Sequence, residues 1–348
     1  MRARDLGIEF EGTPGPFNAI TDVAGLEVGY STLIEGEGVR TGVTAVLPRG
    51  RDSKDPCFGG WFPLNGNGEM TGTTWLEESG FLEGPVMITN THSVGAVQAA
   101  TVKWQHETGK MFQPFSYPIV AETYDGDLND INGFHVREEH VRAAIDSART
   151  GPIAEGNVGG GTGMICYRFK GGTGTSSRRT DDGYTVGVIA QCNFGLRHQL
   201  MITGVPVGKK IPLTEPWDKP VSPSGTEQGS IIIVVATDAP LMPHQCKRLA
   251  RRAAMGLART GSHAGNGSGD IMIAFSTANP GAASPESGIA TVQALSNAKI
   301  TPIFDAVIYA TEEAIINAMV SAETMTGHSG RTVHRLPHED VKSLMAKR

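Results

Sequence analysis

The sequence predicts a mixed α/β protein (α+β) in which layered β-sheets are flanked by helices. Strand-like apolar runs and helical patterns both occur along the chain, without the strict strand–helix–strand alternation of a parallel fold. Glycine-rich loops join these segments, and the 45 glycines are about twice the usual share of about 7%. The 348 residues suffice for a large core, and we expect one domain over residues 1–348.

Six segments have the composition of strands, with apolar and β-branched residues between turn-forming residues. They are residues 20–30, 42–47, 85–90, 184–192, 230–236 and 271–277. The clearest of them is 230–236, where a run of isoleucine and valine follows Ser230. Such a continuous apolar run is typical of a strand that is buried on both faces.

Four segments have helical patterns: residues 136–149, 243–259, 311–324 and 339–347. In 243–259, Leu249, Ala253 and Leu257 recur every four residues beside a face of lysine and arginine. This spacing predicts an amphipathic helix whose apolar side packs on the core.

Composition excludes several classes of function. The net charge of −6 argues against a nucleic-acid binder, which needs a basic face. No apolar stretch is long enough to span a membrane, and the charged N-terminus lacks an apolar signal segment, so we expect a cytoplasmic protein. The four cysteines are scattered without a paired motif. We therefore expect no metal and no cofactor.

The dipeptide Gly229-Ser230 is the most informative point of the chain. If the chain is cut there, Ser230 carries both a hydroxyl nucleophile and a free α-amine, and an α-amine has a pKa of about 7.7–8.0. Such an amine can deprotonate the hydroxyl near neutral pH. On its own the dipeptide is much more typical of the plain start of a strand, since short motifs often match by chance.

Longer segments carry a more specific signal. The segment 229–241 resembles the processing site of the L-aminopeptidase/D-amino-acid esterase-amidase family, which includes the β-peptidyl aminopeptidases. Further segments resemble the family in the same order nearly end to end: 2–7, 12–16, 18–23, 40–44, 121–126, 156–163, 191–195 and 268–270.

The resemblance implies a fold and an activity. The fold is a four-layer αββα sandwich like that of N-terminal-nucleophile hydrolases, with different connectivity. The chain is expected to cleave itself into an α chain, 1–229, and a β chain, 230–348, which assemble as a homotetramer of αβ units. The implied substrates are small peptides, amides or esters with a free amine.

The resemblance also assigns catalytic roles residue by residue. Ser230 matches the nucleophile, and Asn193 matches the side-chain donor of the oxyanion hole. Ser268 and Asp270 match a pair that orients the amine and hydroxyl of Ser230. From the residues alone, Asn193 is more typical of a strand-ending turn, and Asp270 is typical of a loop that leads into the strand 271–277.

Two further residues match the family's substrate pocket. Glu122 is expected to pair with the substrate's amine, and Tyr124 to place a hydroxyl near the tetrahedral intermediate. Without the resemblance, Glu122 and Tyr124 are equally typical of an exposed edge strand with a packed tyrosine. The chain has ten histidines, which could serve a Ser-His-Asp triad, but no GxSxG nucleophile-elbow motif. We therefore interpret His92, His198 and His244 as structural or surface residues.

Two other functions stay open at this point. One is an acyltransferase of the ornithine acetyltransferase type, which shares the processing chemistry but uses threonine, so that serine at position 230 disfavours it. The other is a non-catalytic ligand-binding protein on the same scaffold, which would remain uncut.

Overall fold

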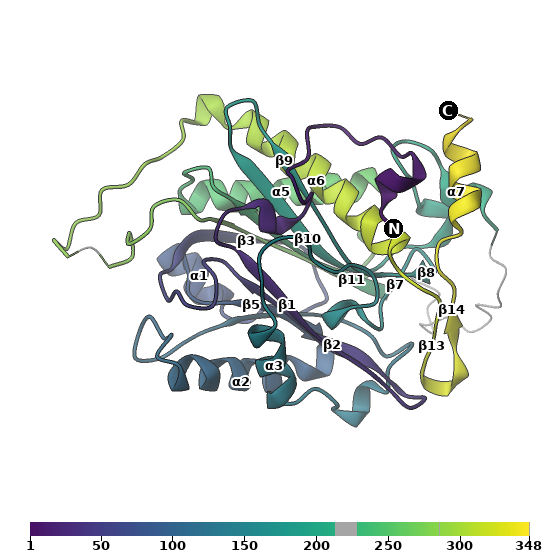
Figure 1. Ribbon diagram of the computed structural model, residues 1–348, viewed down its shortest axis with the longest axis horizontal. Coiled ribbons are helices and arrows are strands. Elements are labelled where there is room, and N and C mark those ends of the chain that lie inside the picture. The colour runs from purple at the N-terminus through teal and green to yellow at the C-terminus, as the bar shows by residue number, and fades with distance from the viewer. Residues whose placement is uncertain (213–227, 285, 348) are drawn as a thin grey trace.

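Two β-sheets stack face to face, and helices cover the outer face of each sheet (Figure 1). The structure is a computed structural model that describes residues 1–212, 228–284 and 286–347. The order of layers is helix, sheet, sheet, helix. The predicted αββα sandwich is therefore confirmed.

The larger sheet has the strand order β4-β3-β12-β11-β10-β9. Its pairs are antiparallel except for β11 and β12, which run parallel. The strands are β3 (Cys57–Gly66), β4 (Phe81–Leu82), β9 (Gly172–Arg179), β10 (Thr185–Asn193), β11 (Gln228–Thr237) and β12 (Gly267–Ser276).

The smaller sheet has the order β1-β2-β5-β6, in which β5 and β6 are parallel. Its strands are β1 (Glu27–Glu35), β2 (Val39–Leu47), β5 (Val86–Asn90) and β6 (Ile119–Thr123). Two short ribbons complete the strands: β7 (Ile165–Cys166) with β8 (Phe169–Lys170), and β13 (Met325–Thr326) with β14 (Thr332–Val333).

Two long helices, α5 (Pro243–Arg259) and α6 (Thr301–Val320), pack on the larger sheet. On the opposite side, α2 (Val94–Glu107) and α3 (Glu138–Asp146) pack on the smaller sheet. The remaining helices are the short α1 (Thr73–Ser79), α4 (Val207–Lys210) and α7 (His338–Met345).

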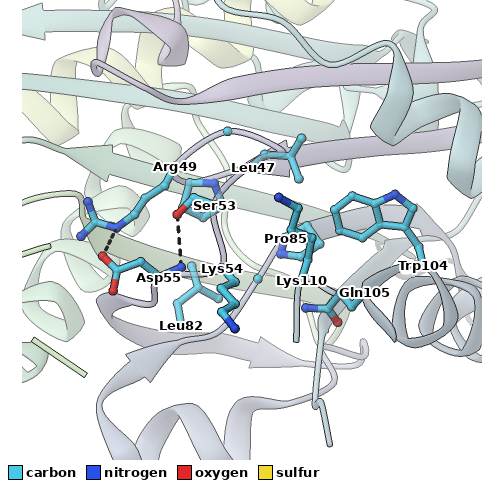
Figure 2. A pocket seen from close by; sticks show the side chains of 13 residues that line it. Leu47, Arg49, Ser53, Lys54, Asp55, Leu82, Pro85, Trp104, Gln105 and Lys110 are labelled. Atoms are coloured by element: carbon cyan, nitrogen blue, oxygen red, sulfur yellow. Dashed lines mark hydrogen bonds and ion pairs between the residues drawn. The ribbon is translucent and has the colours of Figure 1, made fainter. Parts of the chain in front are cut away.

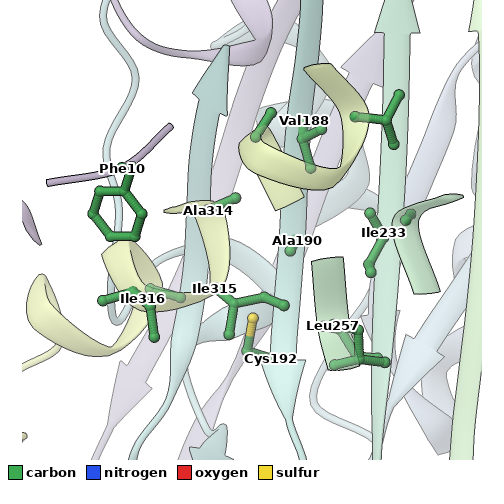
Figure 3. Close-up of a cluster of buried hydrophobic side chains, with 14 of the residues drawn as sticks. Phe10, Val188, Ala190, Cys192, Ile233, Leu257, Ala314, Ile315 and Ile316 are labelled. Atoms are coloured by element: carbon green, nitrogen blue, oxygen red, sulfur yellow. The ribbon is translucent and has the colours of Figure 1, made fainter. Parts of the chain in front are cut away.

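Strand β11 shows how the sequence creates the layers. Ile231 and Ile233 face α5 and α6, whereas Ile232 and Val234 face the smaller sheet. Successive side chains of a strand point to opposite faces, so a run of β-branched residues supplies both cores at once. Figure 3 shows the helix-side core, in which side chains of β10, β11, α5 and α6 meet.

The predicted strands all occur, with changes at their ends. The strand predicted over residues 20–30 is wrong at its start: residues 20–22 form a 3₁₀ turn, and β1 begins at Glu27. The carboxylate of Asp22 accepts the backbone N–H groups of Phe17 and Ala19, and Gly25 has a φ of 80°, so this stretch turns instead of extending. Strand β12 begins at Gly267, ahead of the predicted 271, because Gly267–Asp270 pair with β11 and β3.

Among the predicted helices, 243–259 is confirmed at both ends as α5. The helix predicted at 311–324 begins ten residues earlier and ends at Val320. Residues 311–320 of α6 are buried on all sides, whereas the first half buries Ile303, Phe304 and Val307 on one face and exposes Thr301 and Asp305. The segments 136–149 and 339–347 correspond to α3 and α7 with shifted ends.

Within the described ranges, no helix is long and apolar enough to cross a membrane. In the same ranges no group of His, Cys, Asp and Glu side chains is arranged to hold a metal ion. The four cysteines are buried thiols.

Candidate active site

A pocket of about 400 Å³ opens where one end of β11 and β10 meets β6 of the other sheet. Four of the residues predicted for the site line it: Ser230, Asn193, Glu122 and Tyr124. The rest of its lining is Asn67, Gly68, Glu69, Thr91, Asp127, Ile165, Arg168, Phe194, Gly195, Gly229 and Gly267.

Ser230 stands near the start of β11, directly opposite Asn193 of β10 in the antiparallel register. Because alternate residues of a strand face the same side, the Ser230 side chain points toward the smaller sheet, as those of Ile232 and Val234 do. The residue is 2% exposed, and its Oγ accepts a hydrogen bond from the Tyr124 N–H at 3.3 Å. The nucleophile predicted from the sequence is thus held against strand β6.

Asn193 has its side-chain amide fixed by two backbone groups. Its Oδ1 accepts the N–H of Ile165 at 2.8 Å, and its Nδ2 donates to the carbonyl of Tyr124 at 2.7 Å. These contacts define which end of the amide carries the donors. The backbone N–H of Tyr124 contacts Ser230 and its carbonyl contacts Asn193, so the structure brings the predicted nucleophile and the predicted oxyanion donor together.

Glu122 is buried in β6, with 3% of its surface exposed. One carboxylate oxygen accepts the N–H of Glu69 at 3.0 Å, and the other accepts the hydroxyl of Thr91. Burial raises the pKa of Glu122, and these hydrogen bonds oppose the increase. Among the described residues no lysine or arginine forms an ion pair with it. The charge of His92 also lowers the pKa of Glu122, but no described lysine or arginine neutralises this buried carboxylate, which can therefore bind an ammonium ligand.

Tyr124 contributes its backbone to this arrangement. Its side chain is 42% exposed, and burial raises the pKa of its phenol, helped by the charges of Asp127 and Asp125. The hydroxyl lies against the backbone of Gly126, where an added Cβ would be 2.3 Å from it. The predicted contact of this hydroxyl with a tetrahedral intermediate therefore stays a prediction, whereas the backbone contacts are present.

Ser268 and Asp270 lie on β12, not in a loop, and neither lines the pocket. The Ser268 hydroxyl donates to Asp270 Oδ1 at 2.6 Å, and both residues are buried. The parallel register places Ser268 beside Gly229, and strand alternation turns its side chain to the face opposite the Ser230 side chain. No hydrogen bond joins Ser268 to Ser230 in the described part of the chain. This pair lies beside the peptide bond 229–230 instead.

The sequence did not indicate three features of the pocket. Thr91 holds Glu122, the N–H of Ile165 holds Asn193, and Arg168 contributes a positive charge to the lining. Thr91 directly follows strand β5, and a polar residue after a buried strand is the signal that would have found it. A backbone N–H leaves no such signal.

A second cavity lies at the edge of the smaller sheet, near Leu47, Leu82 and Trp104 (Figure 2). Its volume of about 20 Å³ suits a single water molecule. It is bordered by the ion pair between Arg49 and Asp55, whose Nε and Oδ2 are 3.3 Å apart. It is too small for an amino acid and holds none of the predicted site residues.

Residues 18–333 match the model of peptidase family S58. The chain belongs to this family. A β-peptidyl aminopeptidase, BapA, of Sphingosinicella microcystinivorans is 54% identical over 365 aligned positions, which cover 99% of this chain and 92% of that protein. Membership of the family makes the chain a serine-type aminopeptidase, a hydrolase.

Two solved structures have the same fold. A β-aminopeptidase of a Burkholderia species superposes with a TM-score of 0.92 at 45% identity, covering 100% of this chain and 99% of that one. The L-aminopeptidase D-Ala-esterase/amidase of Ochrobactrum anthropi has a TM-score of 0.91 at 46% identity, with 99% and 98% coverage. The latter is described as a variant of the N-terminal-nucleophile hydrolase fold, so the predicted fold with altered connectivity is confirmed. These similarities support the hydrolase, and not the acyltransferase or the ligand-binding protein that the sequence left open.

Proposed function

We propose that the chain cleaves itself before Ser230 and that the mature enzyme uses the new α-amine as its base. One observation carries this proposal: Ser230 lines a pocket in which no described lining residue is a histidine or a lysine. A serine hydroxyl needs a base within hydrogen-bond reach. The α-amine of Ser230 itself, with a pKa near 7.7–8.0, meets that need.

The proposed reaction is an acyl transfer in two steps. The Ser230 oxygen attacks the substrate carbonyl while its proton moves to the α-amine, and the Nδ2 of Asn193 donates to the negative oxygen. Collapse of the intermediate breaks the C–N bond, and the ammonium returns the proton to the leaving amine. Water then hydrolyses the ester by the same proton route, which releases the acid and restores the hydroxyl.

Self-processing uses the same hydroxyl. The Ser230 oxygen attacks the carbonyl carbon of Gly229, the peptide bond breaks, and residue 229 is transferred from nitrogen to oxygen. Hydrolysis of this ester yields the chains 1–229 and 230–348. We propose that the Ser268–Asp270 pair, which the strand register puts beside that peptide bond, hydrogen-bonds the amine as it forms.

The buried carboxylate of Glu122 is proposed to bind the substrate's ammonium group. This explains why an aminopeptidase rejects a capped N-terminus, since a neutral amide would leave the carboxylate unpaired. The curated relative is named for β-peptides and the Ochrobactrum enzyme for L-amino-acid and D-alanine substrates. We propose small substrates with a free α- or β-amine for this chain. The predicted homotetramer of αβ units and the cytoplasmic location stay predictions.

The role of Glu122 is tested with the isosteric variant Glu122→Gln. We expect KM for an amino-acid p-nitroanilide to rise about 10–100-fold, because a charge-assisted hydrogen bond contributes about 1.5–3 kcal/mol. The neutral amide can still accept the Glu69 N–H and donate to the Thr91 hydroxyl, so folding should persist.

Glu69→Gln is the matched control, because this exposed glutamate lines the same pocket and its side chain makes no hydrogen bond among the described residues. We expect its KM to stay within about twofold of the wild type. An unchanged KM in Glu122→Gln, or equal turnover of the N-acetylated substrate by the wild type, would contradict the proposed role.

A further inference from the structure

The ribbon β7–β8 turns through two residues with unusual backbone conformations. Tyr167 and Arg168 have φ angles of 51° and 63°. A two-residue hairpin turn with both φ values positive is normally made from asparagine and glycine, because side chains with bulk are strained there. Strain of this kind persists where the surrounding structure holds it, and it is often found at functional sites.

The first turn residue is fixed by its side chain. Tyr167 is fully buried, its hydroxyl is 2.8 Å from the Thr260 hydroxyl, and its ring packs edge-on against Phe194 at 5.0 Å between centroids. The Arg197 guanidinium donates to the carbonyls of Tyr167 and of Arg168, at 3.1 Å and 2.7 Å. The turn is therefore held in one conformation, and this determines where residue 168 is presented.

Arg168 lines the active-site pocket and also a neighbouring cavity beside Leu196 and Lys209, so it stands between the two. Its positive charge, together with that of Arg331, opposes the rise in pKa that burial causes at Asp127. Asp127 forms an ion pair with Arg331. This wall of the pocket thus has one guanidinium, that of Arg168, and one carboxylate, that of Asp127, which is already paired with Arg331 outside the lining.

The opposite wall is acidic. In the strand order β3-β12-β11-β10, strand β11 with Ser230 has β12 and β3 on one side and β10 on the other. Glu122 lies on the side of β3 and β12, where its carboxylate would be 3.3 Å from a Cβ added at Gly68. Arg168 lies on the side of β10, which its ribbon contacts. The nucleophile therefore stands between a negative and a positive wall.

We propose that Arg168 binds the free carboxylate of the substrate, so that the preferred substrates are short zwitterionic peptides. This rests on the proposed function, in which Glu122 binds the ammonium end and Ser230 attacks the carbonyl between the two charges. A guanidinium matches a carboxylate in planar geometry and charge. The strained turn is the structural feature that places it.

The test compares a dipeptide, β-alanyl-alanine, with its C-terminal amide. We expect wild-type kcat/KM to be at least about tenfold higher for the free acid, since hydrogen bonds to charged groups are among the strong ones. In Arg168→Asn this ratio should fall to near one, mainly through KM for the acid. Arg168→Lys should retain part of the preference.

Asparagine is the chosen replacement because it adopts the left-handed conformation with little strain. The unfolding temperature of Arg168→Asn, compared with that of the wild type, separates loss of binding from loss of folding. Arg179→Gln is the charge-matched control, because Arg179 is an exposed residue at the far end of β9, and it should leave the ratio unchanged.

An unaltered acid-to-amide ratio in Arg168→Asn, with both substrates still hydrolysed, would overturn this inference alone. Absence of turnover of both compounds by the wild type would overturn the proposed function and this inference with it.

Discussion

At the scale of single residues, the site depends on the backbone of one residue, Tyr124. The N–H of Tyr124 contacts the Ser230 hydroxyl, and the carbonyl of Tyr124 accepts from Asn193. Asp125, the next residue, is fully buried and accepts hydrogen bonds from Asn90 and Asn129. Burial raises the pKa of Asp125 to about 6, and the hydrogen bonds oppose this rise. A buried, hydrogen-bonded side chain thus fixes the backbone that aligns nucleophile and oxyanion donor.

The role of Asn193 leads to a prediction about turnover. Asn193→Ala removes the Nδ2 donor, and Asn193→Asp removes it while its carboxylate can still accept the Ile165 N–H. We expect kcat to fall by about 10²–10³ in both variants, with a much smaller change in KM, because the donor acts on charge that develops in the transition state. Steady-state kinetics on processed protein measures this. A variant with unchanged kcat would remove Asn193 from the oxyanion hole.

At the scale of elements, the start of β11 is packed unusually closely against the end of β10. A Cβ added at Gly229 would be 2.4 Å from the carbonyl oxygen of Asn193 and 2.8 Å from the Phe194 Cα. Both are backbone atoms that cannot move aside as a flexible side chain can. Glycine at position 229 thus permits the strand spacing that aligns Ser230 with Asn193.

Gly229→Ala should therefore slow self-cleavage. A displacement of reacting groups by about 1 Å can cost about 100-fold in rate, and we expect a decrease of this order. The appearance of the two chains on a denaturing gel after synthesis measures it. Gly66→Ala is the matched control, since a Cβ at this strand end would contact nothing within 4 Å. Cleavage at the wild-type rate in Gly229→Ala would show that this close approach is not needed.

The elements also show what a sequence can reveal. The run 230–236 predicted the central strand because its β-branched residues face two cores. Helix α2 was missed because small residues such as Ala96, Ala99 and Ala100 give it only a weak amphipathic pattern. The turn at Tyr167 and Arg168 was also missed, because neither residue is typical of a hairpin turn.

At the scale of the whole molecule, the site belongs to two sheets. Ser230 and Asn193 come from the larger sheet, and Glu122 and Tyr124 come from the smaller one. The sequence identified these four residues through their resemblance to a family, but it did not reveal that the two sheets meet at the pocket. The placement of Ser268 and Asp270 on the other face of the larger sheet follows from strand register, which composition does not specify.

The central claim is that Ser230 becomes a chain terminus and that its amine serves as the base. Intact mass spectrometry of the active protein, with Ser230→Ala alongside, tests this claim most directly. The wild type should consist of two chains, 1–229 and 230–348, and the variant should be a single inactive chain of 348 residues. An active wild type of one unbroken polypeptide, or a Ser230→Ala variant that is cut at the same bond, would contradict it.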